Sequence, residues 1–580
     1  MAGFLGLSVQ RVELRSRSAS PPPDGSICAV HCRTLGEELA RGSTLAEVKS
    51  WFGPRPAKIL IYGFTPAPQD APVLQAWAGL AVDGVNPVGA GKKTYAFDRA
   101  LEQHDIPLAG LSFESAERNA CTFRTTSGAQ DYSTLVSLND APLLLSQRVG
   151  DTEFFLLAGS ELADLDAVVR PPAHACPAYP TLLPAIVFLR VAFPEACWRN
   201  PQPAANFIID DPLLRRRYGF VEYATLLAEA QAHGYAVTIG FIPFNHGRTD
   251  RRVAEFLRGH GDRFSIAVHG CDHTAREFGS EDGALLAHKS RLAWTRMEQH
   301  QQATALPFDP VMVFPQGVYS TVALHALKRS GYGAAVNTNP HPQDGGARPL
   351  KLRDFLDGAV MAHHSFPVFL RRYPTGVFDF AVDLLFGKPV LLVEHHDYFK
   401  PGCAPLAAMV ASINRLEKKL VWMPLGRVVA SHAWMRPLGP GRFAVRFWSN
   451  IFRWKNPTAA RATFVLEKAE IDGPLVEQVT VNGKLTDFTL KDGRLSCEVA
   501  LDSGECASVQ VVYREAAAVP RRFSLRYRSS ASARRYLSEF RDNYLSRHDR
   551  LLAAAVKLKN LGRRRAAPDV VASLEHDEAA

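Results

Sequence analysis

The segment 206–211 reads Asn-Phe-Ile-Ile-Asp-Asp, an apolar run that ends in two aspartates. A short apolar run rich in isoleucine and phenylalanine is typical of a buried strand. We therefore predict a strand over 206–210, with Asp210 and Asp211 at its carboxyl end. The strands and helices predicted on either side decide what fold this strand belongs to.

Strands and helices alternate regularly around this segment, from about 195 to 437. The predicted strands are 206–210, 235–241, 264–268, 311–314, 333–337 and 389–394. The predicted helices are 220–233, 250–259, 284–302 and 319–330. This order predicts an α/β fold with a parallel sheet, open or closed into a barrel. In such a fold the functional side chains lie at the carboxyl ends of the strands.

The chain has 580 residues, which corresponds to about three or four domains. An N-terminal segment, 1–50, contains a Pro-rich breaker at 20–25. A smaller α/β domain is predicted over 51–180, with strands at 58–64, 106–114 and 152–159 and a helix at 71–82. Its outline resembles amidotransferase-like or flavodoxin-like domains, but it has no nucleophile-elbow cysteine and no Gly-rich phosphate loop, so a structural or docking role is favoured.

The chain beyond 437 changes to short alternating runs with turn signals. An antiparallel β-sandwich is predicted over 438–515, with a hairpin turn at Asn482-Gly483. The residues 516–580 form a basic tail, in which leucines and aromatic residues recur at helical spacing among arginines. This amphipathic helix packs on the protein or is solvated, and the alternative is contact with a membrane surface or another protein.

The net charge of +9 comes from this tail. Residues 521–565 contain 14 Lys and Arg against three acids, a net of +11, so the remaining residues are together near neutral. A basic catalytic domain that binds nucleic acid is therefore not expected.

Targeting signals and cysteine pairs are not indicated either. The N-terminus lacks the apolar region of a secretory signal, and the most apolar stretch, 182–193, contains Arg190 and is too short to span a bilayer. The nine cysteines are odd in number and show no CxxC spacing, which favours a reducing, cytoplasmic setting. Pairing of Cys497 with Cys506 across a hairpin stays open as a minor alternative.

Three groups of polar residues coincide with predicted strand ends. They are Asp210-Asp211, His269-Gly-Cys-Asp-His273 and Glu394-His395-His396-Asp397. Two histidines four residues apart can direct both imidazoles at one point, and one carboxylate completes a three-ligand metal site with an open position for water. Such a metal acidifies the water, and a second carboxylate beside the ligand can take its proton. This explains two adjacent aspartates with different roles.

These motifs resemble those of the polysaccharide deacetylase family, also called the NodB-homology or carbohydrate esterase family 4-like domain. The resemblance implies a distorted (β/α) barrel over 195–437 with Asp210 as the general base. It implies a metal site formed by Asp211, His269 and His273, with Gly270 at the position where the family has Ser or Thr. The last family motif, an apolar residue, any residue and a His, implies His395 as the acid that protonates the leaving group. His396 is the alternative, since the two side chains would point to opposite faces of a continued strand.

The sequence departs from the family at two motifs. The family has an Arg before a Pro-aromatic pair, which braces the base, whereas this chain reads Val313-Phe-Pro-Gln-Gly317 without that Arg. Where the family has an Asp and a Trp, this chain reads Asn337-Thr-Asn339. Pro315, Gln316 and Asn337 are the candidate substrate-binding residues. His246 is interpreted as a loop residue and Cys271 as a small buried filler.

The resemblance implies a metal-dependent hydrolase that removes acyl groups, such as acetyl, from an amino sugar or a polysaccharide. Zinc is the favoured cofactor, and cobalt, nickel or iron would also suit histidine and carboxylate ligands. The alternative is a catalytically weakened carbohydrate-binding or polysaccharide-biosynthesis scaffold that keeps the metal site. A glycoside-cleaving enzyme is the third hypothesis, for which no second carboxylate is found at a suitable position.

Overall fold

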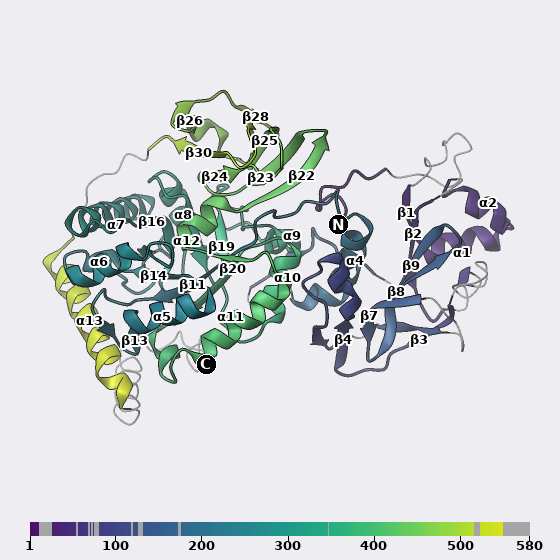
Figure 1. Ribbon diagram of the computed structural model, residues 1–580, viewed down its shortest axis with the longest axis horizontal. Coiled ribbons are helices and arrows are strands. Elements are labelled where there is room, and N and C mark those ends of the chain that lie inside the picture. Colours follow the sequence, from purple (N-terminus) through teal and green to yellow (C-terminus); the bar gives the residue numbers. More distant parts are fainter. Residues whose placement is uncertain are drawn as a thin grey trace.

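The computed structural model describes residues 1–10, 26–53, 56–67, 70, 73–74, 81–117, 120–125, 132–159, 161–171, 176–345, 347–515 and 523–548. Figure 1 shows an N-terminal sheet domain, a central barrel with helices around it, a second β-domain packed on the barrel, and a long C-terminal helix along the barrel's side. No helix among the described residues is long and apolar enough to cross a membrane. All nine cysteines are free, so Cys497 and Cys506 do not pair.

The central domain is a parallel barrel, as the alternation of strands and helices predicts. Its strands lie in the order β19-β17-β16-β15-β14-β11-β20, and Arg372, just after β19, pairs with Leu392 of β20, which closes the ring. The short strand β19 was not among the predicted strands. The strand bounds are β11 (Ala204–Asp210), β14 (Val237–Phe241), β15 (Phe264–His269), β16 (Asp309–Val313), β17 (Ala334–Asn337), β19 (Val368–Leu370) and β20 (Val390–Glu394).

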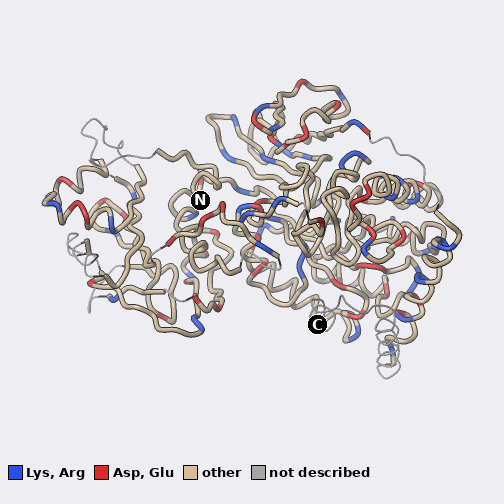
Figure 2. Tube along the Cα trace, turned by 180° about the vertical axis from the view of Figure 1, so that it is seen from behind, with Lys and Arg blue, Asp and Glu red and all other residues tan. Residues whose placement is uncertain are grey.

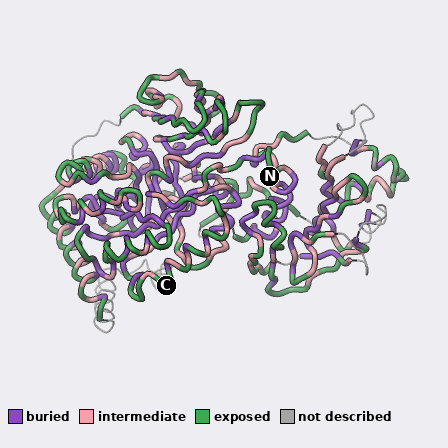
Figure 3. The backbone as a smooth tube through the Cα atoms, in the orientation of Figure 1, coloured by how far each residue is buried: buried purple, intermediate pink, exposed green. Residues whose placement is uncertain are grey.

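Two apolar clusters lie on the two faces of these strands, which Figure 3 shows as a largely buried core. The outer cluster packs beneath the surrounding helices α5 (Tyr223–His233), α6 (Arg251–Gly259), α7 (Gly283–Thr304), α8 (Thr321–Lys328), α10 (Phe378–Leu385) and α11 (Ala404–Leu416). The inner cluster packs against α12 (Leu425–Ser431) and contains Ile208, Ala267, Phe369 and Leu391. Side chains alternate between the faces of a strand. This alternation therefore places Asp210, His269, Arg371 and His395 on the inner side at the carboxyl ends.

The N-terminal domain contains a mixed sheet in the order β1-β2-β9-β8-β7-β4-β5. The strand bounds are β1 (Ile27–His31), β2 (Lys58–Phe64), β9 (Thr152–Ala158), β8 (Ala141–Val149), β7 (Tyr132–Leu138), β4 (Lys93–Phe97) and β5 (Ser112–Ser115). Its helices are α1 (Cys32–Ala40), α2 (Leu45–Ser50) and α4 (Tyr179–Ala192), and β3 (Val82–Pro87) pairs with β6 (Cys121–Thr125).

The predictions for this domain are confirmed in part. Strands predicted at 58–64 and 152–159 are present, whereas the strand predicted at 106–114 is reduced to β5. The helix predicted at 71–82 lies mostly outside the described residues. The boundary at 51 is wrong because β1 pairs with β2. A parallel, flavodoxin-like sheet is also wrong, because β7, β8 and β9 pair antiparallel.

The second β-domain consists of two sheets that enclose one apolar cluster. One sheet contains β22 (Ala433–Gly439), β23 (Arg442–Phe447), β25 (Ala462–Ala469), β29 (Arg494–Leu501) and β28 (Thr489–Lys491). The other contains β24 (Ile451–Lys455), β30 (Cys506–Tyr513), β26 (Val476–Val481) and β27 (Lys484–Leu485). The hairpin at Asn482-Gly483 is confirmed, with positive φ at both residues. The expectation of purely antiparallel pairing is wrong for β23 and β25, which are parallel.

The remaining elements are short or peripheral, apart from one helix. They are β10 (Val168–Val169), β18 (Leu350–Lys351), β12 (Arg217–Tyr218), β13 (Val221–Glu222), β21 (Val421–Trp422) and α9 (Leu352–Leu356). The tail forms α13 (Leu525–Asn543), which packs on the barrel beside the loops that follow β11, β14 and β15 (Figure 1). The predicted tail beyond 548 lies outside the described residues.

Candidate metal centre

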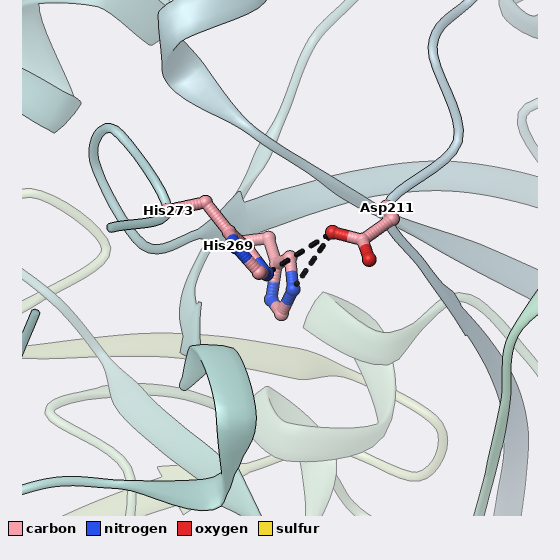
Figure 4. A group of neighbouring side chains, drawn as sticks. All are labelled: Asp211, His269 and His273. Carbon is pink, nitrogen blue, oxygen red and sulfur yellow. Dashed lines mark ion pairs between the residues drawn. The ribbon is translucent and has the colours of Figure 1, made fainter. Parts of the chain in front are cut away.

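Asp211, His269 and His273 converge at the carboxyl ends of β11 and β15 (Figure 4). The Nε2 atom of His273 lies 3.1 Å from Asp211 Oδ1, and that of His269 lies 3.5 Å from the same oxygen. One ligand atom from each residue falls within a group no wider than 4.8 Å. The three residues that the spacing predicts are therefore brought together as one carboxylate and two imidazoles.

These donors fit a divalent cation. His269 Nδ1 donates to the backbone oxygen of Val313 at 3.0 Å, which leaves the lone pair of Nε2 directed at Asp211. Asp211 Oδ1 is buried and has no hydrogen-bond partner among the described residues. Burial would raise the pKa of Asp211, but the two imidazoles hold it well below its usual range. An ionised carboxylate oxygen and imidazole nitrogen are ligands that zinc prefers.

The backbone of the site is held in an uncommon conformation. Asp211 has φ of 79° and His273 has φ of 54°, the left-handed region that side-chain-bearing residues rarely adopt. Such strain persists only where the surrounding structure enforces it, and it concentrates at functional sites. Asp211 N donates to Gly240 O, which ties the strained turn after β11 to β14.

Glu277 holds the loop that carries the two histidines. Its carboxylate accepts from the backbone N–H groups of Cys271, Asp272 and His273 at 2.9 to 3.0 Å, and Lys289 donates to it at 2.9 Å. Gly270 has φ of 69°, and a Cβ there would lie 2.8 Å from Glu277 Oε2. A side chain at position 270 would therefore need space that Glu277 and Pro315 occupy.

A second group of side chains that could bind a metal, Cys271, Asp272 and Glu277, lies nearby, but its two carboxylates already have hydrogen-bond partners. Asp272 accepts from Arg296 and from Tyr527, each at 2.7 Å, and Glu277 is saturated by the loop and Lys289. Burial raises the pKa of the Cys271 thiol well above its usual value, which favours the protonated thiol. Cys271 is fully buried, in agreement with the prediction that it fills space.

Asp210 is held by an arginine, Arg371, that the motif analysis of the sequence did not identify. Arg371 donates from both terminal nitrogens to the two carboxylate oxygens at 2.8 and 2.7 Å, and both side chains are about 4% exposed or less. The expectation that the base lacks a bracing Arg is therefore wrong. The arginine comes from the end of β19 instead of the residue before Pro315. Burial would raise the pKa of Asp210, but Arg371 and His269 keep it below its usual value.

The two histidines after β20 face different surroundings. His395 is half-buried and directly follows β20, where strand alternation puts it on the same inner side of the barrel as Asp210. His396 is buried, and its Nε2 lies 3.3 Å from Asp542 Oδ1 of α13, with the rings of Tyr218 and Phe220 beside it. His396 is therefore occupied by its contact with α13, whereas His395 is the more exposed of the two.

The candidate substrate-binding residues are mostly occupied by loop contacts. Gln316 accepts from the backbone N–H of Arg276 at 3.1 Å, and Asn337 donates to Gly317 O and Asn339 O at 2.9 and 2.8 Å. Pro315 is buried against Gly270. These residues shape the rim and make no contact that points to sugar binding. His246 interacts with the oxygen of Pro243 at 3.1 Å and is outside the ligand cluster, as a loop residue would be.

Helix α13 contributes three polar side chains at the rim that sequence patterns did not identify. Tyr527 donates to Asp272, Arg535 donates to His273 Nδ1 at 3.3 Å, and Asp542 accepts from Tyr218 at 2.7 Å besides pairing with His396. Arg535 and Asp542 are 5% and 2% exposed. The periodicity of apolar residues gives no signal for these contacts, because the buried stripe of α13 is polar.

Comparison with known proteins finds similarity at the level of structure. No family model and no curated protein sequence matches this chain. The chain is similar to Agd3, described as a novel carbohydrate deacetylase, with 11% identity, a TM-score of 0.45, and coverage of 88% of this chain and 96% of Agd3.

Two smaller proteins are similar to the central part. For a family 4 carbohydrate esterase from Streptomyces lividans in complex with acetate, the identity is 11%, the TM-score 0.24, and the coverage 38% of this chain and 91% of the esterase. For a family 4 acetyl xylan esterase from Clostridium thermocellum in complex with a cobalt ion, the corresponding values are 10%, 0.23, 39% and 89%.

Proposed function

We propose that this chain is a metal-dependent hydrolase that removes acyl groups, such as acetyl, from an amino sugar or a polysaccharide. The observation that carries the proposal is the joint geometry of two adjacent aspartates. Asp211 converges with His269 and His273, while Asp210 is held separately by Arg371. One carboxylate therefore faces a cation site, and the other is an ionised base beside it.

Asp211, His269 and His273 would hold the ion, and zinc is favoured by this ligand set. When bound there, a divalent ion supplies Lewis acidity toward an acyl carbonyl and toward water. His269 is already in the tautomer that offers Nε2, because Nδ1 donates to Val313 O. His273 must carry its hydrogen on Nδ1 to do the same.

Asp210 would take the proton of the attacking water. Arg371 keeps its carboxylate ionised and fixes its orientation through two parallel hydrogen bonds. The neighbouring strand has Gly240 opposite Asp210, and a Cβ there would lie 2.8 Å from Asp210 Oδ1. The glycine thus leaves the space that the carboxylate occupies, and a base in this place accounts for about 10²–10⁴-fold in rate.

His395 would protonate the departing amine or alkoxide. His395 follows β20, and the alternation of side chains along a strand puts it on the inner side of the barrel, as it does Asp210. The proposed acid and base would therefore lie on the same side of the sheet. His396 is held in the contact with Asp542 and is less able to serve.

The alternative of a catalytically weakened scaffold depended on a missing arginine. Arg371 fills that role from another strand, and the pairing is bidentate and buried. The hydrolase is therefore preferred over the scaffold.

The test separates metal binding from turnover. Acetate release from acetylated amino-sugar oligosaccharides is measured with and without a chelator, together with the metal content of each variant. Asp210→Asn should lose about 10²–10⁴-fold in rate while it retains the metal. Asp211→Asn should lose both, and Asp250→Asn, at an exposed helix N-cap, should lose neither. Full activity of Asp210→Asn, or wild-type activity insensitive to the chelator, would contradict the proposal.

A further inference from the structure

Helix α13 has two faces of different character. The inner face carries Tyr527, Ala531, Arg535 and Asp542, which contact the barrel rim. The opposite face carries large exposed apolar side chains, of which Tyr536 also lies against Arg248 of the barrel, 4.5 Å from the ring centroid to the guanidinium carbon. They are Leu525, Tyr536, Leu537, Phe540 and Tyr544, with exposed fractions of 81%, 59%, 68%, 52% and 64%. Tyr536, Phe540 and Tyr544 recur every four residues and Leu537 lies three residues before Phe540, so these four form one ridge along the helix.

This ridge is unusual for the surface of the molecule. Fourteen large hydrophobic side chains are exposed among the described residues, and five of them lie on this one helix and the residue after it. Phe540 and Tyr544 also stack on each other, with ring centroids 5.5 Å apart. Isolated exposed leucines are normal, whereas a contiguous apolar patch often marks a surface that binds another protein or a membrane.

The charges of α13 are divided between its faces. Both acids are directed at the barrel, where Glu539 pairs with Arg248 and Asp542 pairs with His396. The exposed charged side chains of the helix are Arg526, Arg528 and Arg541, of which Arg541 also donates to Asp542. Figure 2 shows blue segments, which mark Lys and Arg, recurring along this edge of the molecule. The exposed part of the helix therefore combines apolar and aromatic side chains with serines and positive charge, while both acids are directed at the barrel.

We infer that the outer face of α13 docks on an anionic phospholipid surface. Leucine and aromatic side chains insert at the boundary between headgroups and acyl chains, and arginines bind lipid phosphates. A protein partner would need an apolar groove rimmed by acids, whereas an anionic bilayer offers both features at once. The sequence after α13 adds further lysines and arginines up to Arg565, which increases the attraction.

Docking in this way has a consequence for the barrel. The inner face of α13 contacts loops that follow β11, β14, β15 and β20, which are the loops of the candidate metal centre. A bilayer bound to the outer face would therefore lie on the side of α13 that faces away from these loops.

Vesicle co-sedimentation of the full chain tests this inference. Vesicles of phosphatidylcholine alone are compared with vesicles that contain phosphatidylglycerol, at low and high salt. Binding is expected to the anionic vesicles only and to weaken with salt. Leu537→Ser combined with Phe540→Ser, and separately Arg526→Glu combined with Arg528→Glu, should each reduce binding roughly tenfold or more.

Matched controls make the same chemical changes elsewhere. Ile471→Ser with Leu485→Ser alters two exposed apolar residues of the second β-domain, and Lys418→Glu with Lys419→Glu alters exposed charges next to β21, at the amino end of the barrel. Both controls should bind like the wild type. The inference is overturned if the wild type does not bind anionic vesicles, or if both α13 variants still bind them fully. It is also overturned if the ridge variants instead dissociate a dimer in light scattering while vesicle binding is unchanged.

Discussion

Arg371 and Asp210 form a buried pair whose loss should be seen in the pH profile. The pKa of Asp210 lies below its usual value of 3.8, so the pair stabilises the fold above that pH and loses this contribution as pH falls through the lowered pKa. In Arg371→Met, burial is opposed less strongly and the pKa of Asp210 rises. We expect the acid limb of kcat/KM to move to higher pH and stability to fall by about 3–5 kcal/mol.

Arg372 provides the control for this prediction, since it is adjacent and has its own carboxylate. It pairs with Asp383 at 2.7 Å, away from Asp210. Arg372→Met should also lower stability in a denaturant titration, but the pH profile of the remaining activity should stay in place. An unchanged profile in Arg371→Met would show that the pair is only structural.

Arg535 should oppose metal binding at His273. A guanidinium can only donate, so its contact at 3.3 Å makes Nδ1 of His273 the acceptor and leaves the hydrogen on Nε2, the atom that a metal needs. Its positive charge acts in the same direction. Arg535→Met should therefore raise zinc affinity by about tenfold, measured by competition with a chromophoric chelator. Arg528→Met, exposed on the same helix, should not change it, and a lower affinity of Arg535→Met would refute the argument.

At the scale of the element, the loop after β15 is shaped by Glu277 and not by the hydroxyl residue of the family. Restoring that residue as Gly270→Ser should therefore destabilise the protein. The new Cβ would lie 2.8 Å from Glu277 Oε2 and 2.9 Å from Pro315 Cγ, at a φ of 69°. We expect a loss of about 1–3 kcal/mol in the free energy of unfolding together with weaker metal binding.

Gly247→Ser is the matched control, because a Cβ at Gly247 would meet nothing within 4 Å. Thermal unfolding of both variants decides between the alternatives. If Gly270→Ser matched the control, Glu277 would have room to move, and its carboxylate would not be what excludes the family's residue.

At the scale of the whole molecule, a buried charge network joins the barrel to the second β-domain. Glu470 accepts from Lys328 of α8 at 2.6 Å, from Lys468 of β25 at 3.2 Å and from Tyr513. Glu470→Gln would leave the buried Lys468 without its carboxylate and Lys328 with only Asp472 at 3.4 Å, at a cost of about 3–5 kcal/mol. The loss should be measured by denaturant unfolding followed with tryptophan fluorescence and circular dichroism.

The exposed pair of Arg494 and Glu467 is the control for that network, since it lies 3.5 Å apart on the surface. Glu467→Gln should change stability by less than about 1 kcal/mol. A comparably small effect of Glu470→Gln would mean that the two domains are held together by apolar packing alone.

The barrel and the metal ligands could be predicted because local patterns encode them. Apolar runs such as 206–210 specify strands, and the alternation with helices specifies a parallel order, which brings Asp211, His269 and His273 to one rim. Strand β19 was not predicted because only three residues, Val368–Leu370, belong to it. Arg371 was missed with it, since its role depends on the end of that strand.

The sequence by itself determined which residues are candidates for a metal centre, because ligand spacing and strand ends are properties of short segments. Only the tertiary structure decided which arginine braces Asp210 and which face of α13 meets the barrel. The apolar residues of α13 point outward, while Arg535 and Asp542 are buried through ion pairs and hydrogen bonds. The periodicity of apolar residues alone would predict that the apolar face of α13 is buried and that Arg535 and Asp542 are exposed. Pairs between residues more than a hundred positions apart form through space, so no local pattern records them.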